Sequence, residues 1–217
     1  MENCCIEKKA VLYYIMVMEV KMSDPAYKLD EYFTYADYVL WDTSNGLTQE
    51  RFELVDGIAY SMGAPTVAHQ IISMELSGAF FNYFKDKSCR VFAAPFDVRL
   101  FPKNDESDDT VFQPDISVIC DKTKLVDGRA CKGAPDLVIE ILSNSSIMMD
   151  RKIKPEKYLK AGVKEYWIVD SKNADVYLHR LINGEYSAVL YTDIVRSNIF
   201  PGLEINLDLI RKELQPA

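Results

Sequence analysis

The stretch PDLVIEILS, Pro135–Ser143, is the part of the sequence that decides the fold. Its inner residues LVIEIL are apolar except for Glu140, and a short, nearly unbroken apolar run is typical of a strand buried on both faces. We therefore expect this strand at the centre of the sheet. Burying a carboxylate there is costly unless it has a cation, hydrogen-bond donors or a metal ion as a partner. Glu140 is thus the first candidate functional residue.

The segments on either side of this strand predict a mixed α/β domain. Apolar spacing and capping residues indicate helices at residues 33–42, 67–84 and 155–162. Alternating or continuous apolar runs indicate extended chain at residues 51–62, 89–101, 111–120, 165–170, 175–181 and 185–191. Asp56-Gly57 and Asn183-Gly184 are strong hairpin turn signals. The order predicts one mixed central β-sheet flanked by α-helices, with an N-terminal hairpin and a C-terminal β-hairpin.

Two polar segments separate these elements. The run NDESDD, residues 104–109, predicts a solvent-exposed acidic loop, and residues 121–134 are polar and contain glycine. We expect one strand, Val111–Cys120, between them.

Composition limits the class of protein. The net charge of −8 argues against a protein that coats nucleic acid or an anionic membrane through bulk charge. The odd number of cysteines and the absence of a CxxC pair suggest neither a disulfide framework nor a cysteine-rich zinc site, so a reducing cytoplasm is expected. The cysteines are Cys4, Cys5, Cys89, Cys120 and Cys131. No glycine-rich phosphate loop is present, which argues against a nucleotide triphosphatase or an organic dinucleotide cofactor.

The start of the chain is expected to be an appendage. The apolar run AVLYYIMVM is interrupted by Glu19 and Lys21 and is shorter than a membrane helix or a clear secretory signal requires. Met16, Met18 and Met22 offer later start codons. We interpret residues 1–24 as the appendage and residues 25–217 as a single domain with no membrane segment.

Two further acids belong with Glu140. Asp115 opens the apolar run ISVIC, and if its strand neighbours that of Glu140, both side chains can point into one cleft. Glu53, on the first arm of the hairpin, supplies a third carboxylate. Such an oxygen-rich cleft suits Mg²⁺, and a lysine from DRKIKPEKY (Lys152, Lys154 or Lys157) would assist hydrolysis by a metal-activated water.

Several ordered blocks of the chain together resemble a known family. The blocks are Pro114-Asp115, ELVDG at 53–57, PDLVIEILS at 135–143 and DRKIK…AGVKEYWIVD between 150 and 170. Over residues 33–181 they are similar to the Uma-type family of restriction endonucleases, within the PD-(D/E)xK nuclease superfamily. The resemblance implies a restriction-endonuclease-like fold, with Glu53, Asp115 and Glu140 as metal-site acids for Mg²⁺ or Mn²⁺ and Lys154 as the lysine.

One departure concerns that lysine. The superfamily pattern places lysine at position 142, where this chain has Leu142, so the role passes to Lys154 by analogy with members whose lysine has moved. Pro155 disfavours helical dihedrals at Lys154, which leaves Lys152 as a competitor.

Other polar residues have a structural and a functional interpretation. His69 is either a helix cap or surface group, or a contact of the substrate or of the metal-binding acids. Arg99 is either an ion-pair partner of Glu140 or a substrate contact. We expect Asp136, His179 and Tyr158 to be structural.

The sequence therefore predicts a Mg²⁺- or Mn²⁺-dependent DNA endonuclease acting as a homodimer, so that two sites address two strands. The acidic balance is the main objection, since DNA binding needs clustered cations. The dense basic run lies beside the proposed site, at Lys152, Lys154, Lys157, Lys160 and Lys164. One alternative is a catalytically silent nuclease-fold module that binds nucleic acid or protein. The other is a hydrolase that uses Glu53 and Glu140 as an acid/base pair on a sugar.

Overall fold

The computed structural model of the protein describes residues 32–43, 51–143 and 148–215. The expected appendage at residues 1–24 lies outside these residues. In the described part of the chain, no helix combines the length and the apolar character needed to cross a lipid bilayer.

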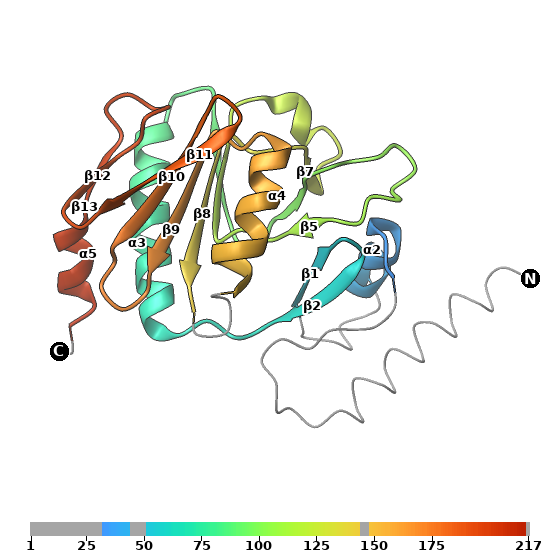
Figure 1. Cartoon of the computed structure of the whole chain (residues 1–217), viewed down its shortest axis with the longest axis horizontal. Coiled ribbons are helices and arrows are strands. Elements are labelled where there is room, and N and C mark those ends of the chain that lie inside the picture. The colour runs from blue at the N-terminus through green and yellow to red at the C-terminus, as the bar shows by residue number, and fades with distance from the viewer. Residues whose placement is uncertain (1–31, 44–50, 144–147, 216–217) are drawn as a thin grey trace, which may run out of the picture.

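The elements follow one another along the chain as Figure 1 shows. The helices are α2 (Tyr35–Thr43), α3 (Val67–Phe84), α4 (Lys154–Ala161) and α5 (Leu207–Glu213), with a 3₁₀ turn η1 (Lys122–Leu125) and a π-helical turn η2 (Met149–Ile153). The early strands are β1 (Arg51–Val55), β2 (Ile58–Met62), β3 (Arg90–Ala93), β4 (Asp97–Arg99), β5 (Val111–Phe112) and β6 (Ile116–Ile119). The later strands are β7 (Ala130–Lys132), β8 (Leu137–Leu142), β9 (Glu165–Asp170), β10 (Val176–Ile182), β11 (Glu185–Tyr191), β12 (Ile194–Arg196) and β13 (Glu204–Asn206).

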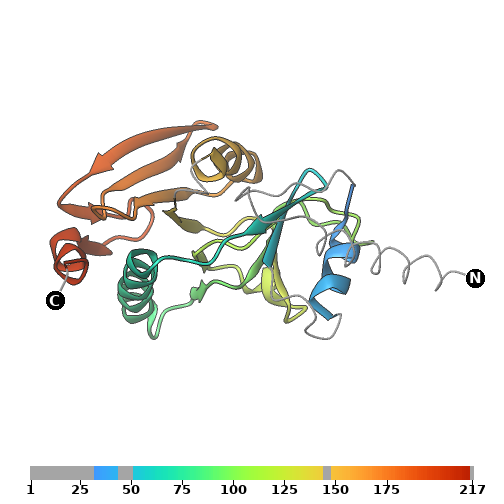
Figure 2. The same cartoon turned by 90° about the horizontal axis from the view of Figure 1, so that it is seen from below.

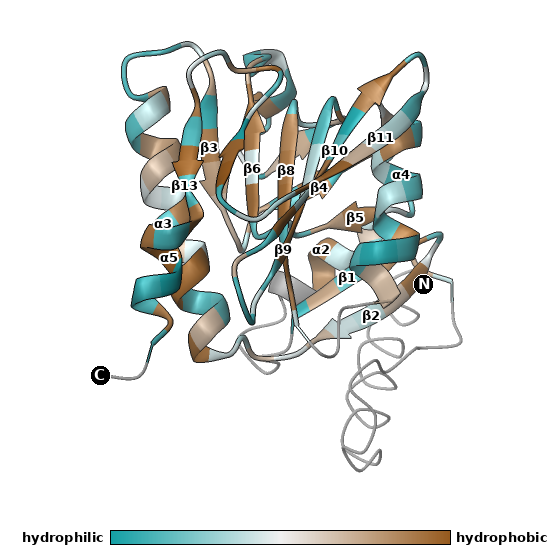
Figure 3. Cartoon of the chain, turned by 60° about the vertical axis from the view of Figure 1, so that its left-hand side comes forward, coloured by the Kyte–Doolittle hydropathy of each residue, from teal (hydrophilic) through white to brown (hydrophobic). Residues whose placement is uncertain are grey.

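Strand β8 lies inside a six-stranded mixed sheet with the order β11-β10-β9-β8-β6-β3. It pairs in parallel with β9 and antiparallel with β6. All six of its residues are buried, and Figure 3 shows it largely in the brown of apolar residues. The prediction of a central buried strand is confirmed.

Helices cover both faces of this sheet, so the side chains of β8 pack alternately into two different cores. Leu137, Ile139 and Ile141 join the core formed with α3 and α5, whereas Val138 and Leu142 join the core formed with α4. Figure 2 shows α3 and α4 on opposite sides of the strands. Because successive side chains of a strand point to opposite faces, Glu140 is on the α4 side.

A second sheet, with the order β2-β1-β5-β4-β7, packs with α2 around a smaller core. Its first two strands form the expected hairpin, with Leu54 opposite Ala59. Asp56 and Gly57 have φ angles of 50° and 78°, the left-handed conformations that a tight hairpin turn needs. The second expected hairpin, β10–β11, turns at Asn183 and Gly184.

The prediction of a single strand at residues 111–120 is wrong. The chain forms β5 in the five-stranded sheet and β6 in the six-stranded sheet, separated by Gln113–Asp115. Pro114 has no N–H to donate to a strand partner, and the N–H of Gln113 donates to the carboxylate of Glu53 (2.9 Å). This break is how one segment serves both sheets.

The sequence predicted that the acidic loop at residues 104–109 is solvent-exposed, but one of its acids is buried. Asp108 is 1% exposed and accepts hydrogen bonds from Arg99 Nε (2.8 Å) and Nη2. Residues 121–134 contain η1 and β7, which their polar composition did not predict. The elements β12, β13 and α5, which follow the last predicted strand, were not predicted either.

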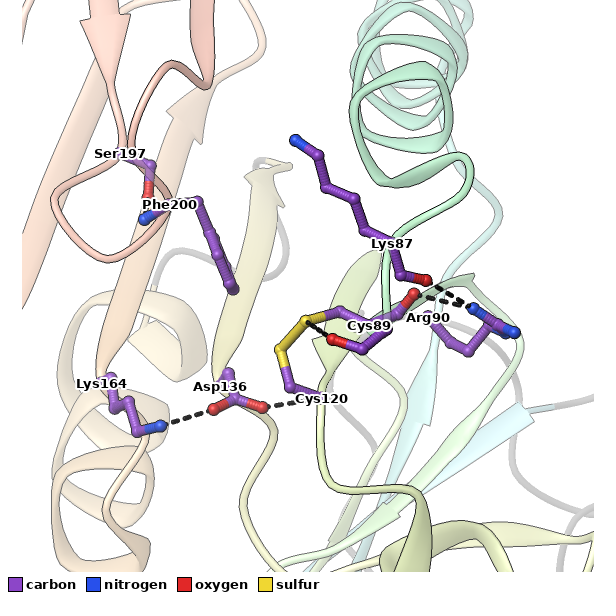
Figure 4. The surroundings of a disulfide bond; sticks show 9 residues. Lys87, Cys89, Arg90, Cys120, Asp136, Lys164, Ser197 and Phe200 are labelled. Atoms are coloured by element: carbon purple, nitrogen blue, oxygen red, sulfur yellow. Dashed lines mark hydrogen bonds and ion pairs between the residues drawn. A yellow bond between two sulfur atoms is a disulfide. The ribbon is translucent and has the colours of Figure 1, made fainter.

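The expectation that the cysteines are unpaired is corrected by a disulfide between Cys89 and Cys120. These residues flank the register Arg90↔Ile119 of the antiparallel pair β3–β6, so the pairing of strands brings them together. Figure 4 shows the bond, with the N–H of Cys120 donating to Asp136 (2.8 Å). Cys131 is a buried free thiol, with its pKa raised to about 12 by burial.

Candidate active site

A pocket of about 310 Å³ lies where the two sheets, α3 and η2 meet. Its polar lining comes from segments far apart in the sequence. Four carboxyl groups and three possible cationic partners line it: Glu53, Asp115, Glu140, Asp150, Arg51, His69 and Lys154. The three acids and the lysine expected from the sequence therefore border one cavity.

Lys154 binds three buried carboxylates at once. Its Nζ lies 2.9 Å from Glu140 Oε1, 3.0 Å from Glu53 Oε1 and 3.3 Å from Asp150 Oδ1. The lysine and these acids are each at most 4% exposed. The ammonium thus joins an acid from each sheet to an acid of η2.

Glu140 lies against α4 because it follows Val138 on the same face of β8. Its Oε1 accepts hydrogen bonds from Lys154 Nζ (2.9 Å) and Tyr158 Oη (2.7 Å). Lys154 and Tyr158 are four residues apart, a spacing that places side chains on one face of a helix. Tyr158 is therefore both a core residue, as expected, and a direct partner of the acid.

Glu53 reaches the pocket from β1, where every residue from Phe52 to Val55 is buried. Its Oε1 accepts the backbone N–H of Gln113 and the ammonium of Lys154. The strand break before Pro114 thus supplies the donor that holds this acid in place.

Asp115 follows that break and lies one residue before β6. In the β6–β8 register Ile116 opposes Ile139, so Asp115 comes next to Glu140. Its Oδ2 accepts the N–H of Ile141 (2.7 Å) and lies 3.2 Å from Nε2 of His69. The neighbouring strands that the sequence interpretation required are present.

His69 lies in the first turn of α3, whose N-cap is Thr66 rather than the histidine itself. Its Nδ1 is buried and has no hydrogen-bond partner within the described residues. Burial lowers the pKa of the imidazole, but the hydrogen bond and charge of Asp115 outweigh this, so the pKa is raised above its ordinary value. The structure therefore places His69 against Asp115, one of the candidate metal-binding acids, and not at a cap position or on the surface.

The electrostatics of the pocket are unbalanced toward negative charge. Burial raises the pKa of Glu140 well above its usual value, and nearby acids raise it further, although Lys154 acts in the opposite direction. Burial also raises the pKa of Glu53. Burial alone would lower the pKa of Lys154, but Glu140, Glu53 and Asp150 raise it well above its usual range. One ammonium cannot neutralise three buried carboxylates, so protons or a further cation must share the task.

Of the two candidate lysines, Lys152 and Lys154, only Lys154 lies among the acids. Lys152 is exposed, whereas Lys154 is 3% exposed among the acids. The expectation that Pro155 keeps Lys154 out of helical dihedrals is wrong, since Lys154 has φ −61° and ψ −42°. Turn η2 runs directly into α4, with the proline in the first turn of that helix, where proline is tolerated.

Asp150 is the pocket acid that the sequence interpretation missed. It is 2% exposed and lies four residues before Lys154. Its signal in the sequence was this i, i+4 spacing to the candidate lysine, which has meaning only if residues 149–154 are helical.

Three other residues lie away from the acid cluster. Arg99 is fully buried against Asp108 and the ring of Tyr35, so it is not the partner of Glu140. Asp136 accepts hydrogen bonds from Cys120 N and Lys164 Nζ, in agreement with its structural interpretation. His179 packs between tyrosine rings of the sheet, and burial lowers its pKa.

The donor set fits a divalent cation in chemistry and charge. Carboxylate oxygens are the ligands that Mg²⁺ prefers. Glu53 and Glu140 use only Oε1 for their hydrogen bonds to described residues, and both line the pocket. Within the ranges 32–43, 51–143 and 148–215, however, no group of three or more His, Cys, Asp or Glu side chains is arranged to hold a metal ion as it stands. Lys154 lies between the acids instead.

Comparison with known proteins gives three likenesses. Residues 35–208 match the family model described as "Uma2: Putative restriction endonuclease". The chain is 26% identical over 183 residues to "Uncharacterized protein slr1290" of Synechocystis sp. (strain ATCC 27184 / PCC 6803 / Kazusa), covering 82% of this chain and 90% of that protein. A crystal structure titled as a putative nuclease belonging to DUF820, from Anabaena variabilis ATCC 29413, superimposes with a TM-score of 0.66 at 19% identity.

That alignment covers 84% of this chain and 99% of the other, and it shows that the mixed sheets with their flanking helices form a nuclease-like α/β fold. Since the family model spans most of the chain, the protein belongs to the Uma2 restriction endonuclease family.

Proposed function

We propose that the protein is an endonuclease that hydrolyses phosphodiester bonds of DNA with the help of Mg²⁺ or Mn²⁺. The observation that carries the proposal is the position of Lys154 Nζ, within 3.3 Å of Glu53, Glu140 and Asp150, in a pocket that Asp115 and His69 also line. Family membership supports nuclease chemistry at this pocket.

Each side chain has a role in this proposal. Asp115, Glu140 and Glu53 would hold the metal, which when bound lowers the pKa of a coordinated water and neutralises charge on a phosphate oxygen. Lys154, which already contacts two of these acids, would orient the attacking water or stabilise the transition-state charge. His69, through its contact with Asp115 Oδ2, would fix the orientation of that carboxylate.

The test is cleavage of supercoiled plasmid and of single-stranded DNA with Mn²⁺ or Mg²⁺, with and without a chelator. We expect metal-dependent cutting that Glu140→Gln and Lys154→Met each reduce by at least about a hundred-fold, the size typical of lost electrostatic catalysis. Asp136→Asn is the matched control, because Asp136, like Glu140, binds a lysine but lies outside the pocket.

The alternative, a catalytically silent nuclease-fold module, is favoured by one observation: Lys154 occupies the space between the acids, and no three described acids form a ready metal site. Titration calorimetry with Mn²⁺ separates the two. Heat of binding that disappears in Glu140→Gln supports the nuclease, whereas neither binding nor cutting by folded protein supports the silent module.

The proposal also includes a homodimer, which sedimentation of the purified protein tests.

The second alternative from the sequence is a hydrolase that acts on a sugar. Sugar hydrolysis by Glu53 and Glu140 would be insensitive to chelator, so a chelator-resistant glycosidase activity would replace the nuclease proposal.

A further inference from the structure

The pocket has an apolar wall that the acid cluster does not use. Met62 of β2, Met74 of α3 and Met149 of η2 line it, together with Pro65 and Ala93. Met74 is 72% exposed although it is a large apolar side chain. Methionine adapts its shape to flat aromatic rings and contacts them favourably through its polarisable sulfur. This wall is therefore suited to a planar, partly apolar group such as a nucleobase.

The same face of α3 carries polar groups suited to the edge of a base. Gln70, Ser73 and Ser77 line the pocket at helical spacing around Met74. Their side chains form no hydrogen bond with any residue that the structure describes. An amide offers both donors and an acceptor, which is how proteins pair with base edges. A base lying on Met74 would have hydrogen-bonding partners one turn away on the helix.

The depth of the acids restricts what form of DNA reaches them. Glu53, Glu140 and Lys154 are 4%, 3% and 3% exposed, so a phosphate meets them only by entering the pocket. A paired duplex is stiff, with a persistence length of about 50 nm, and its stacked neighbours hold each phosphate on the outside of the helix. An unpaired strand can turn a single nucleotide inward.

The charges near the pocket also disfavour a duplex. Lys157 and Lys164, part of the basic run, are each 2.6 Å from an acid, Asp56 and Asp136 respectively. Among the described residues that line the pocket, the lysine and arginine side chains are Lys154 and Arg51. Binding along a duplex requires many neutralised phosphates, whereas one or two cations match a short unpaired segment.

We propose that this pocket binds one unstacked nucleobase together with its phosphate, so that the substrate is single-stranded or locally unpaired DNA. The inference rests on the proposed nuclease function and names its substrate class. The base lies on the methionine wall, and Gln70, Ser73 and Ser77 bind its edge. The phosphate is then placed at Lys154 and the acids.

The first test measures binding without cleavage, by fluorescence anisotropy in the presence of a chelator. The probes are a labelled oligothymidylate and an oligonucleotide of the same length whose central nucleotides are abasic, so that the phosphates are kept and the bases are lost. We expect the abasic probe to bind at least roughly five-fold more weakly, as loss of base stacking predicts. Equal affinity for the two probes, or no binding of either, would overturn the inference.

The second test compares Met74→Ala with Phe81→Ala in steady-state cleavage of a single strand. We expect Met74→Ala to raise KM about five-fold or more with kcat within about two-fold, as for lost uniform binding. Phe81 is a matched control, because it is also exposed on α3 (64%) but does not line the pocket. A KM unchanged by Met74→Ala would count against the base site.

The third test uses one sequence as a single strand, as a perfect duplex and as a duplex with a central unpaired loop. We expect fast cleavage of the single strand, cleavage of the looped duplex within its loop, and at least about ten-fold slower cleavage of the perfect duplex, in line with the cost of unpairing a base. A perfect duplex cut as fast as the single strand would overturn the inference. If no substrate is cut but the first test shows binding that depends on the bases, the nuclease proposal fails while the base site stands.

Discussion

A single lysine, Lys154, links side chains from three separate stretches of the chain. Glu53 comes from β1, Glu140 from β8 and Asp150 from η2, and the ammonium lies within 3.3 Å of each. Buried carboxylates repel one another unless a cation or protons separate them. At the residue scale, the acidic pocket therefore depends on this one positive charge.

Lys154→Met is expected to lower the free energy of unfolding by about 3–5 kcal/mol at neutral pH, the usual cost of leaving buried charges without their partner. The matched control is Lys164→Met. Lys164 also binds an acid, Asp136, but its side chain is 59% exposed, so its loss should cost about 0–1 kcal/mol. Urea unfolding measures both. Equal effects of the two substitutions would contradict the central role of Lys154.

The pH dependence of that loss follows from the directions of the pKa shifts. The folded pKa values of Glu53 and Glu140 are raised, so protonation of these acids stabilises the fold at low pH, and this contribution is lost as pH rises through the folded pKa values. Without Lys154 the acids would bind protons still more tightly. We expect Lys154→Met to be least destabilising near pH 4.5 and increasingly so toward pH 8, in urea unfolding at each pH.

At the scale of elements, the hairpin β1–β2 holds Glu53 in place, and its turn depends on Gly57. Gly57 has φ +78°, and a Cβ there would lie 2.3 Å from the ring of Tyr32. Both the left-handed backbone and the close ring therefore exclude a larger residue.

Gly57→Ala should destabilise the protein by about 1–3 kcal/mol. Gly78→Ala is the control, because Gly78 lies within α3 and an added Cβ would meet nothing within 4 Å. Alanine there should be neutral or stabilising by up to about 1 kcal/mol. Thermal unfolding of both variants checks the opposite signs.

The strand pair β3–β6 is joined by the Cys89–Cys120 disulfide, which closes a loop with a sequence separation of 31. Loop-closure entropy for that length predicts a stabilisation of about 3–4 kcal/mol. Dithiothreitol should therefore lower the Tm of the wild type but leave the Cys89→Ala/Cys120→Ala variant unchanged. A wild-type Tm that does not respond to the reductant would contradict this prediction.

At the scale of the whole molecule, the pocket is where the two sheets meet. Glu53 belongs to the five-stranded sheet and Glu140 to the six-stranded sheet. Asp115 directly precedes β6, which is also a strand of the six-stranded sheet. A ligand that binds acids of both sheets should therefore stabilise the fold as a unit.

Mn²⁺ is expected to raise the Tm of the wild type, because a ligand at a hundred times its Kd stabilises by about 2.7 kcal/mol. Glu140→Gln should abolish the increase, Asp136→Asn should leave it intact, and chelator should reverse it. An equal increase in Glu140→Gln would place the binding of Mn²⁺ elsewhere on the protein.

The sequence by itself determined the main elements and three of the four acids that line the pocket, Glu53, Asp115 and Glu140. The central strand, the α3 helix and both hairpins follow from local periodicity and turn residues, which act between neighbours in the chain. Glu140 was recognisable because its own neighbours are apolar. Such features need no knowledge of distant contacts.

Tertiary structure alone decided how these residues are partnered. Lys154 rather than Lys152 meets the acids, Asp150 joins them, Arg99 pairs with Asp108, and Cys89 bonds to Cys120. Except for Arg99 and Asp108, which pair across a loop, and Asp150 and Lys154, one helical turn apart, the partners come from different elements of the fold. The pairings between different elements are fixed by distances that exist only after the sheets have packed, because there a side chain's partner depends on the path of the chain through space rather than on its spacing in sequence.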